Sequence, residues 1–202
     1  YKIDIIPSRK SNPFKFSHRV KEYLQTHAYF DYVWINVSSA SIWQFQVYTK
    51  KYTKAKVITH SHGTKFEKTG SILLHIGNLI LHHLNLRRVL SNTDLFFCCS
   101  KAAGIALYGK EKMGELTVVN NGINCDKYGY RDKFRNEIRK EFLVKEEEVL
   151  IGLVGRLSPQ KNPVKAVEIF NAVYEKNPQA KLLIVGTGDL LVEVQQKIAD
   201  LN

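Results

Sequence analysis

The chain has 202 residues, of which 44% are hydrophobic and 24% charged, with 12 glycines and 5 prolines. This apolar content is sufficient for one large or two small cores, and it excludes a disordered or collagen-like chain. Three cysteines are too few for a disulfide framework and indicate a reducing compartment.

The positive charge lies almost wholly in the first part of the chain. Residues 1–119 hold 17 Lys and Arg against 7 Asp and Glu, whereas residues 120–202 hold 13 against 12, and the total is +11. Such a basic half suits phosphates, an anionic bilayer surface or, alternatively, a merely solubilising surface. Nucleic acid is not expected as a partner, because the sequence has no RNP-type aromatic motif, zinc-finger spacing or basic region followed by heptads.

Short apolar runs alternate with helical patterns along the chain. The runs predict strands at residues 3–6, 32–37, 56–59, 95–100, 116–119, 149–154 and 182–185. The patterns between them predict helices at residues 13–26, 39–52, 71–90, 101–108, 131–143, 163–175 and 189–201. This alternation predicts an α/β fold with doubly wound parallel sheets, and the unbroken apolar runs are typical of strands covered on both faces.

The predicted helix 71–90 is amphipathic and ends near Arg87 and Arg88. Its apolar positions fit one helical face: Ile72, Ile76, Leu79, Ile80 and Leu84. Core packing of that face is favoured, and a place on a membrane surface stays open. The run holds too many polar groups for a transmembrane segment.

A change of pattern marks a boundary near residue 121. Asn120, Asn121 and Gly122 are turn residues, and a charged stretch precedes a new strand at Val149. The sequence therefore predicts two domains, residues 1–121 and 122–202. The chain starts inside an apolar run at Tyr1 and stops inside a helical pattern, so we expect it to be cut at both ends.

The loop after the strand 149–154 has the composition of a phosphate site. Gly155 permits close backbone approach, while Arg156 and Lys161 offer a planar donor fork and a point charge. The helix that starts near Pro163 directs its positive N-terminus to the same edge. Two solvated cations on an ordinary loop are the alternative.

A second glycine loop follows the next strand. Gly186 and Gly188 precede Asp189, which is the expected N-cap of the last helix. Because the carboxyl ends of neighbouring parallel strands meet at one edge, the two loops together predict a crevice for a nucleotide diphosphate.

In the first half, His60 and His62 follow the strand 56–59 with a spacing of two. This spacing resembles metal hydrolases, but a metal site needs a third ligand, and none has a spacing signal. The alternatives are imidazoles that bind hydroxyls or phosphate, and a purely structural role, which is favoured for His60.

Taken in order, the motifs resemble the family 4 glycosyltransferases of the GT-B fold, in particular those of bacterial capsule and exopolysaccharide biosynthesis. The matching segments are His60-Ser61-His62-Gly63, Cys98-Cys99-Ser100-Lys101, Val118-Val119-Asn120-Asn121-Gly122-Ile123-Asn124, Ile151-Gly152-Leu153-Val154-Gly155-Arg156-Leu157-Ser158-Pro159-Gln160-Lys161-Asn162 and Leu183-Ile184-Val185-Gly186-Thr187-Gly188.

The resemblance implies a GT-B pair of Rossmann-like domains, with the acceptor held by the first and a nucleotide-diphosphate sugar by the second. It assigns the donor diphosphate to Gly155, Arg156, Lys161, Gly186 and Gly188. It assigns the acceptor cleft to His60, His62, Gly63, Ser100, Asn121 and Gly122, with His62, Arg156 and Lys161 as catalytic residues. Transfer would retain the anomeric configuration and need neither metal nor cofactor.

The same resemblance implies a hexosyl transfer to a glycan acceptor, plausibly lipid-linked, in cell-surface polysaccharide biosynthesis. The expected place is the cytoplasm, peripherally on the anionic inner face of the membrane. The family's first strand with its glycine-rich loop and its glutamate pair are absent from this sequence, so this chain is expected to be an inactive fragment. The alternatives are a non-catalytic polyanion- or membrane-binding module and a GT-B-fold nucleotide-sugar epimerase.

Overall fold

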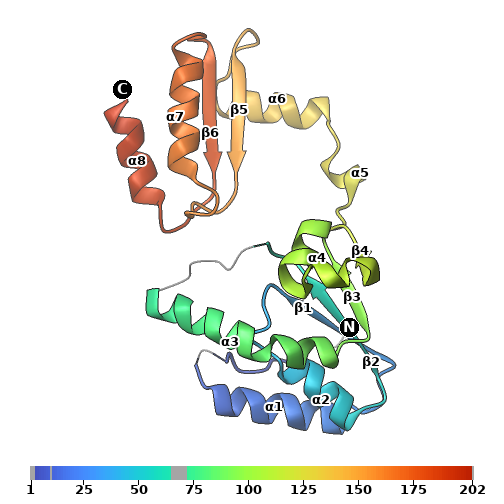
Figure 1. Ribbon diagram of the computed structural model, residues 1–202. Coiled ribbons are helices and arrows are strands. Elements are labelled where there is room, and N and C mark those ends of the chain that lie inside the picture. The colour runs from blue at the N-terminus through green and yellow to red at the C-terminus, as the bar shows by residue number, and fades with distance from the viewer. Residues whose placement is uncertain (1–2, 10, 65–71, 202) are drawn as a thin grey trace. The chain divides into compact units, whose positions relative to one another are not determined.

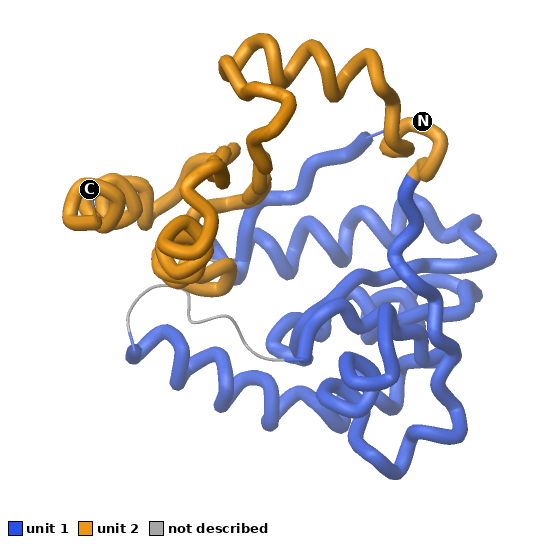
Figure 2. Tube along the Cα trace, turned by 90° about the horizontal axis from the view of Figure 1, so that it is seen from above, with its two compact units in different colours: residues 1–123 blue, residues 124–202 orange. Residues whose placement is uncertain are grey.

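The computed structural model describes residues 3–9, 11–64 and 72–201, and the chain divides into two compact units (Figures 1 and 2). Unit 1 comprises Tyr1–Ile123 and unit 2 comprises Asn124–Asn202. The division falls two residues after the boundary that the turn residues suggested. Each unit is a separate α/β body with its own parallel sheet.

Unit 1 is built on a four-stranded parallel sheet in the order β1-β2-β3-β4. Its strands are β1 (Tyr32–Val37), β2 (Lys56–Ser61), β3 (Leu95–Cys98) and β4 (Leu116–Val118). The register places Asn36 of β1 and Phe97 of β3 on either side of His60. The sequence pattern predicted all four strands, with errors of one or two residues at their ends.

The helices of unit 1 are α1 (Pro13–Thr26), α2 (Gln44–Tyr52), α3 (Ile72–Ser91) and α4 (Lys101–Tyr108), followed by a 3₁₀ helix, η1 (Lys110–Glu115). Asn12 caps α1 as predicted, since its side chain accepts a hydrogen bond from the Lys15 N–H at 2.8 Å. Each strand pairs with the next one in sequence, and right-handed crossovers then place α2, α3 and α4 on the same face of the sheet.

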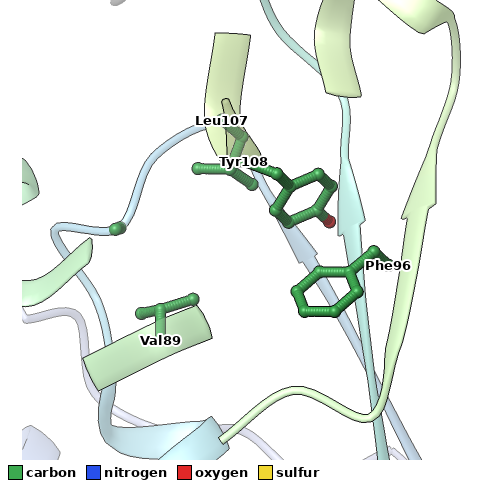
Figure 3. Close-up of a cluster of buried hydrophobic side chains, with 5 residues drawn as sticks. Val89, Phe96, Leu107 and Tyr108 are labelled. Carbon is green, nitrogen blue, oxygen red and sulfur yellow. The ribbon is translucent and has the colours of Figure 1, made fainter. Parts of the chain in front are cut away.

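The core of unit 1 lies between that face and the helices. Val89 of α3, Phe96 of β3, and Leu107 and Tyr108 of α4 pack together (Figure 3). The Tyr108 hydroxyl reaches the sheet itself, bonding to the carbonyl oxygens of Thr59 at 2.5 Å and Phe97 at 2.8 Å. These contacts attach α4 to both central strands.

The other face of this sheet is only partly covered in the part of the chain that the structure describes, where Ile58 and His60 of β2 are 7% and 5% exposed. Tyr32 and Trp34 of β1 are 56% and 48% exposed. The prediction that strands are covered on both faces is therefore confirmed for β2, which is buried from Val57 to Ser61, and wrong for β1. The reason is topological, because strands added in one direction send every crossover helix to one side.

The chain does not form a strand at residues 3–6, where the apolar pattern predicted one. Ile3 and Ile5 are exposed, while Ile6 packs against the cluster of Phe16, Val20 and Leu24 on α1. The segment packs against α1 and does not pair with β1. Its backbone therefore has no strand partner among the described residues.

Two predicted helices differ from the observed ones in orientation or extent. α2 begins at Gln44, not at residue 39, because the Ser39 and Ser41 hydroxyls bond each other at 2.8 Å in the preceding turn. The orientation of α3 differs from the prediction. The face predicted to pack into the core is largely exposed, and the buried residues are His82, Asn85 and Val89. Ser71, the predicted start of α3, lies outside the described residues.

Unit 2 contains a parallel pair, β5 (Val149–Val154) and β6 (Ala180–Val185), in register from Val149 opposite Ala180 to Val154 opposite Val185. Its helices are α5 (Cys125–Tyr128), α6 (Asp132–Glu141), α7 (Pro163–Tyr174) and α8 (Leu191–Asp200). The sequence did not predict η1 in unit 1 or α5 here. α5 is a single turn that the Asn124 side chain caps by accepting from the Lys127 N–H at 3.0 Å.

None of the helices in the described parts of the chain is both long and apolar enough to cross a membrane.

Candidate functional site

In unit 2, the loops after β5 and β6 are joined by their backbones. The Gly155 N–H donates to the Val185 carbonyl, the Leu157 N–H to the Thr187 carbonyl, and the Leu190 N–H to the Leu157 carbonyl, each at 3.0 Å. Leu157 is buried at 2% exposure beneath this junction. The two loops that the sequence paired as a phosphate crevice therefore form one continuous rim.

The glycines of the second loop permit this close contact. A Cβ on Gly186 would collide with the Gly155 carbonyl, and one on Gly188 would collide with the Leu157 carbonyl. Gly186 also has a φ of +153°, which side chains disfavour. The sequence assigned these glycines to ligand approach, and the structure adds a packing reason for both. At Gly155, whose φ is +158°, an added Cβ meets nothing within 4 Å.

Arg156 and Lys161 are the cations of this rim, and both are exposed. Neither side chain has an ion-pair or hydrogen-bond partner within the described ranges 3–9, 11–64 and 72–201. The turn between them is tight, because the Lys161 and Asn162 N–H groups both donate to the Ser158 carbonyl at 3.0 Å. Two uncompensated positive charges thus flank a short loop.

The N-terminus of α7 begins directly after this loop. Asn162 precedes it in the left-handed region at φ 47°, and its side chain makes no capping hydrogen bond. Pro163, at the first position, has no N–H. The next backbone N–H groups of the first turn have no acceptor within the helix and are available to an anion. An anion with oxygens at the 155–162 loop would meet both side-chain charge and the helix dipole.

Asp189 does not cap α8, although the sequence predicted it. The helix begins at Leu191 with Leu190 in the N-cap position and without a side-chain capping bond. The Leu190 N–H donates to the Leu157 carbonyl, so the backbone just before α8 joins this loop to the loop after β5.

In unit 1, His60 and His62 lie together at the carboxyl end of β2. Their rings are 4.1 Å apart between centroids. His62 is exposed, and its backbone N–H continues the sheet by donating to the Val37 carbonyl at 2.9 Å. The predicted proximity of the two imidazoles is what the structure shows.

Asn36 is a residue of this cluster that the sequence did not identify. Its Oδ1 lies 2.9 Å from Nε2 of His62. Because an amide oxygen only accepts, this bond requires the proton of neutral His62 on Nε2 and leaves Nδ1 as an acceptor. The sequence feature that could have identified Asn36 is its position as a polar residue near the carboxyl end of β1, the strand that pairs with β2.

His60 is buried at 5% exposure on the face of the sheet opposite α2, α3 and α4, between Trp34 and Phe97. Its Nε2 has no hydrogen-bond partner among the described residues. Burial, and secondarily the neighbouring His62, lower the pKa of His60 below 6.5, against a smaller opposing effect of the Cys98 and Val119 backbone. Its burial therefore favours the neutral form of His60.

The remaining predicted acceptor residues are less closely organised. The Ser100 hydroxyl caps α4 by accepting from the Ala103 N–H at 3.2 Å, so it has a structural function. Asn121 and Gly122 are exposed at the unit boundary, and a Cβ on Gly122 would meet nothing within 4 Å. Gly63 is partly exposed just after His62. The predicted site residues that the structure brings together are thus the histidine pair in unit 1 and the joined glycine loops in unit 2.

A groove in the described part of unit 2 lies away from the rim of the joined loops. It measures about 580 Å³ and is lined mainly by apolar residues of β6, α7 and α8, among them Phe170, Leu182 and Ile198. None of the predicted donor residues lines it. In the described residues, no three His, Cys, Asp or Glu side chains are grouped as metal ligands would be.

Known proteins share both the sequence pattern and the fold. Residues 134–202 match the family of glycosyl transferases group 1. A UDP-Gal:alpha-D-GlcNAc-diphosphoundecaprenol alpha-1,3-galactosyltransferase of Escherichia coli is 29% identical over 84 residues, which is 40% of this chain and 21% of that protein.

Solved structures extend the likeness to both units. Anabaena Alr3699/HepE, crystallised with UDP, aligns with a TM-score of 0.66 and 20% identity over 90% of this chain and 48% of its own. The UDP-GlcNAc 2-epimerase of Neisseria meningitidis, bound to UDP-GlcNAc, aligns with a TM-score of 0.51 and 11% identity over 98% of this chain and 53% of its own. The chain thus spans about half the length of these structures, and about a fifth of the curated relative.

These findings confirm the predicted fold class, with parallel sheets of the GT-B type. They also confirm the predicted resemblance: this chain is similar in fold to GT-B proteins throughout, and its second unit carries the sequence pattern of the glycosyl transferases group 1.

Proposed function

We propose that the protein containing this chain transfers a hexosyl group from a nucleotide-diphosphate sugar to a glycan acceptor in polysaccharide biosynthesis. The observation that carries the proposal is the rim of unit 2, where Arg156 and Lys161 flank a loop joined to the Gly186–Gly188 loop. This rim lies within the residues that match the glycosyl transferases group 1. UDP-hexoses are the first donors to test, since UDP is bound by HepE and UDP-Gal is named for the E. coli relative.

In the proposed reaction, the bond between the anomeric carbon and the diphosphate oxygen breaks, an acceptor hydroxyl oxygen bonds to that carbon, and the hydroxyl proton passes to the departing diphosphate. The electron pair stays on the diphosphate, so negative charge grows there in the transition state. Arg156 and Lys161 stabilise that charge electrostatically, together with the N-terminal dipole of α7. Two protein cations would supply what a bound metal would supply, and we therefore propose that transfer does not need a metal. Retention of the anomeric configuration is proposed from the resemblance to the family 4 glycosyltransferases alone.

The histidine cluster of unit 1 has the proposed role of holding the sugars. His62 contacts the transferred sugar or the acceptor through Nδ1, while Asn36 fixes its ring from the other side. The acceptor is proposed to be lipid-linked, in line with the diphosphoundecaprenol acceptor in the name of the E. coli relative. A cytoplasmic protein bound peripherally to the membrane would meet such an acceptor, and the basic first unit suits that surface.

The decisive experiment measures UDP and UDP-hexose binding and sugar transfer in the full-length protein. Arg156→Ala combined with Lys161→Ala is expected to weaken UDP binding at least about tenfold, since each loses a charge-assisted contact. Lys176→Ala in the same unit is the matched control, because Lys176 is exposed and lies outside the rim. Equal loss in the control would contradict the role of the rim, and transfer abolished by EDTA would contradict metal independence.

An epimerase is the second candidate, favoured by the alignment with the N. meningitidis enzyme. It would convert a UDP-sugar without an acceptor, whereas a transferase would require one. Product analysis by NMR distinguishes them, and it also reports the anomeric configuration of a transferred sugar. Binding to anionic polymers that is unaffected by the Arg156→Ala, Lys161→Ala double variant, with neither reaction detected, would instead identify a non-catalytic module.

A further inference from the structure

The α3 helix exposes an apolar stripe to solvent. Leu73, Ile76, Ile80 and Leu84 follow one another at spacings of three, four and four residues, which places them along one side of the helix. They are 80%, 46%, 54% and 72% exposed. A surface helix of a soluble domain normally directs such a stripe to the core, so this orientation is reversed.

Hydrogen bonds on the opposite side fix that orientation. The Ala40 N–H donates to Nδ1 of His82 at 3.0 Å, and both residues are buried. Arg9 donates to Oδ1 of Asn78 at 3.2 Å, and Asn85, on the same side of the helix, is buried at 6% exposure. The polar side of α3 is thus attached to unit 1, and rotating the stripe inward would break these bonds.

The charge around the stripe has one sign. α3 contains no Asp or Glu, and Arg87 and Arg88 lie in its last turns. Arg87 is exposed and continues the stripe three residues after Leu84. Arg88 is held over the Trp43 ring at 4.4 Å. Unit 1 as a whole carries a net charge of +10.

The stripe also begins at the edge of the sheet that holds the histidines. In a parallel β-α-β connection the helix runs opposite to the strands, so the N-terminal end of α3 lies toward the carboxyl end of β2, which leads into His62 (Figure 1). A surface that contacts α3 there would approach the proposed acceptor residues.

From these observations we propose that the α3 stripe is a docking surface for an anionic lipid bilayer, with Leu73, Ile76, Ile80 and Leu84 in the acyl boundary and Arg87 at the headgroups. Apolar side chains on a helix that has two arginines and no carboxylate complement such a membrane. A symmetric contact with a second copy is disfavoured, because it would bring two surfaces of the same positive charge together.

This inference deepens the proposed membrane association, and its test uses neither donor nor acceptor. Flotation with vesicles of phosphatidylcholine, with and without about one-third phosphatidylglycerol, measures binding directly. The expected result is binding to the anionic vesicles that decreases with salt. Ile80→Glu with Leu84→Glu is expected to weaken it at least about tenfold, and Arg87→Gln by a smaller factor.

The matched control is Ile169→Glu with Val192→Glu, which places two charges on exposed apolar positions of unit 2. The milder pair Ile80→Ser with Leu84→Ser repeats the test with neutral side chains, and circular dichroism checks folding of every variant. Vesicle binding that is unchanged in both α3 pairs, or lost equally in the control, would overturn the proposal. Analytical sedimentation that shows a dimer, and its dissociation in the α3 variants, would also overturn the proposal. Vesicle binding without sugar transfer would support the surface and contradict only the proposed enzymatic function.

Discussion

At the scale of single residues, the two candidate groups differ in what holds them. His60 is a buried imidazole whose Nε2 has no hydrogen-bond partner among the residues that the structure describes, whereas Arg156 and Lys161 are exposed cations. The stability of the histidine cluster should therefore change with pH. The positions of Arg156 and Lys161 depend on the backbone of the joined loops.

His60 makes the stability of unit 1 dependent on pH. Burial, then His62, lower its folded pKa below the ordinary 6.5, so the unfolded chain binds a proton first as pH falls. The free energy of unfolding is therefore fully retained above about pH 7 and declines below it. Chemical denaturation at a series of pH values should show this decline, and His60→Phe should flatten it. An unchanged slope in the variant would assign the decline to other groups, among them His82, whose pKa is also lowered by burial.

Asn36 should determine the tautomer of His62. In the wild-type protein, ¹⁵N chemical shifts are expected to show neutral His62 protonated on Nε2, since that nitrogen faces the Asn36 oxygen. Asn36→Leu removes the acceptor and should give a mixture of tautomers. A wild-type signal from the Nδ1–H tautomer would contradict the assigned contact.

Gly186 and Gly188 are expected to be intolerant of side chains. Gly188→Ala or Gly186→Ala places a Cβ against the backbone of the 155–157 loop and should destabilise unit 2 by about 2–4 kcal/mol. Gly152→Ala in β5 is the control, because its Cβ meets nothing within 4 Å. Thermal denaturation compares the three, and a Gly188→Ala protein as stable as the control would show that the loops can separate without cost.

At the scale of elements, α4 and α3 illustrate two ways in which helices are attached. α4 is attached through the buried core and the Tyr108 hydroxyl (Figure 3). α3 contributes Val89 to the same core, but nearer its N-terminus it is attached through polar contacts of His82 and Asn78, which leave its apolar stripe outside. Helix periodicity alone could not distinguish these cases, because it identifies a stripe without saying which side the rest of the chain contacts.

The Tyr108 hydroxyl should contribute measurably to unit 1. Tyr108→Phe leaves the buried carbonyl oxygens of Thr59 and Phe97 without this donor, so a loss of about 1–2 kcal/mol in the free energy of unfolding is expected. Tyr174→Phe on α7, where the ring is 48% exposed, should change it by less than about 0.5 kcal/mol. Urea titration measures both. Equal effects would mean that the Tyr108 hydrogen bonds add nothing to stability.

At the scale of the whole molecule, charge and the candidate sites are divided between the units. Unit 1 carries the net charge of +10, the histidines and the stripe, while unit 2 carries the glycine loops and a net charge of +1. This division supports the proposed assignment of acceptor and membrane to the first unit and of donor to the second.

Hydrogen exchange with added UDP tests the division directly. Ligand binding to the folded state slows local opening, so amides at residues 155–162 and 186–190 should exchange more slowly when UDP is present. Amides of the β2 strand in unit 1 should be unchanged. The Arg156→Ala, Lys161→Ala variant should lose the effect, and protection confined to unit 1 would reverse the proposed roles.

Apart from the segment 3–6, η1 and α5, the sequence alone determined the order of strands and helices and the motifs at their ends. The runs 32–37 and 149–154 became strands, and α1 and α4 have the predicted ends, because apolar period, caps and turn residues act within a few neighbours. Only the tertiary structure decided that residues 3–6 follow α1, that Asn36 reaches His62, that Gly188 faces Leu157 and that α3 exposes its stripe. Each of these depends on contacts between residues far apart in sequence, and local pattern carries no information about which side of an element those contacts will cover.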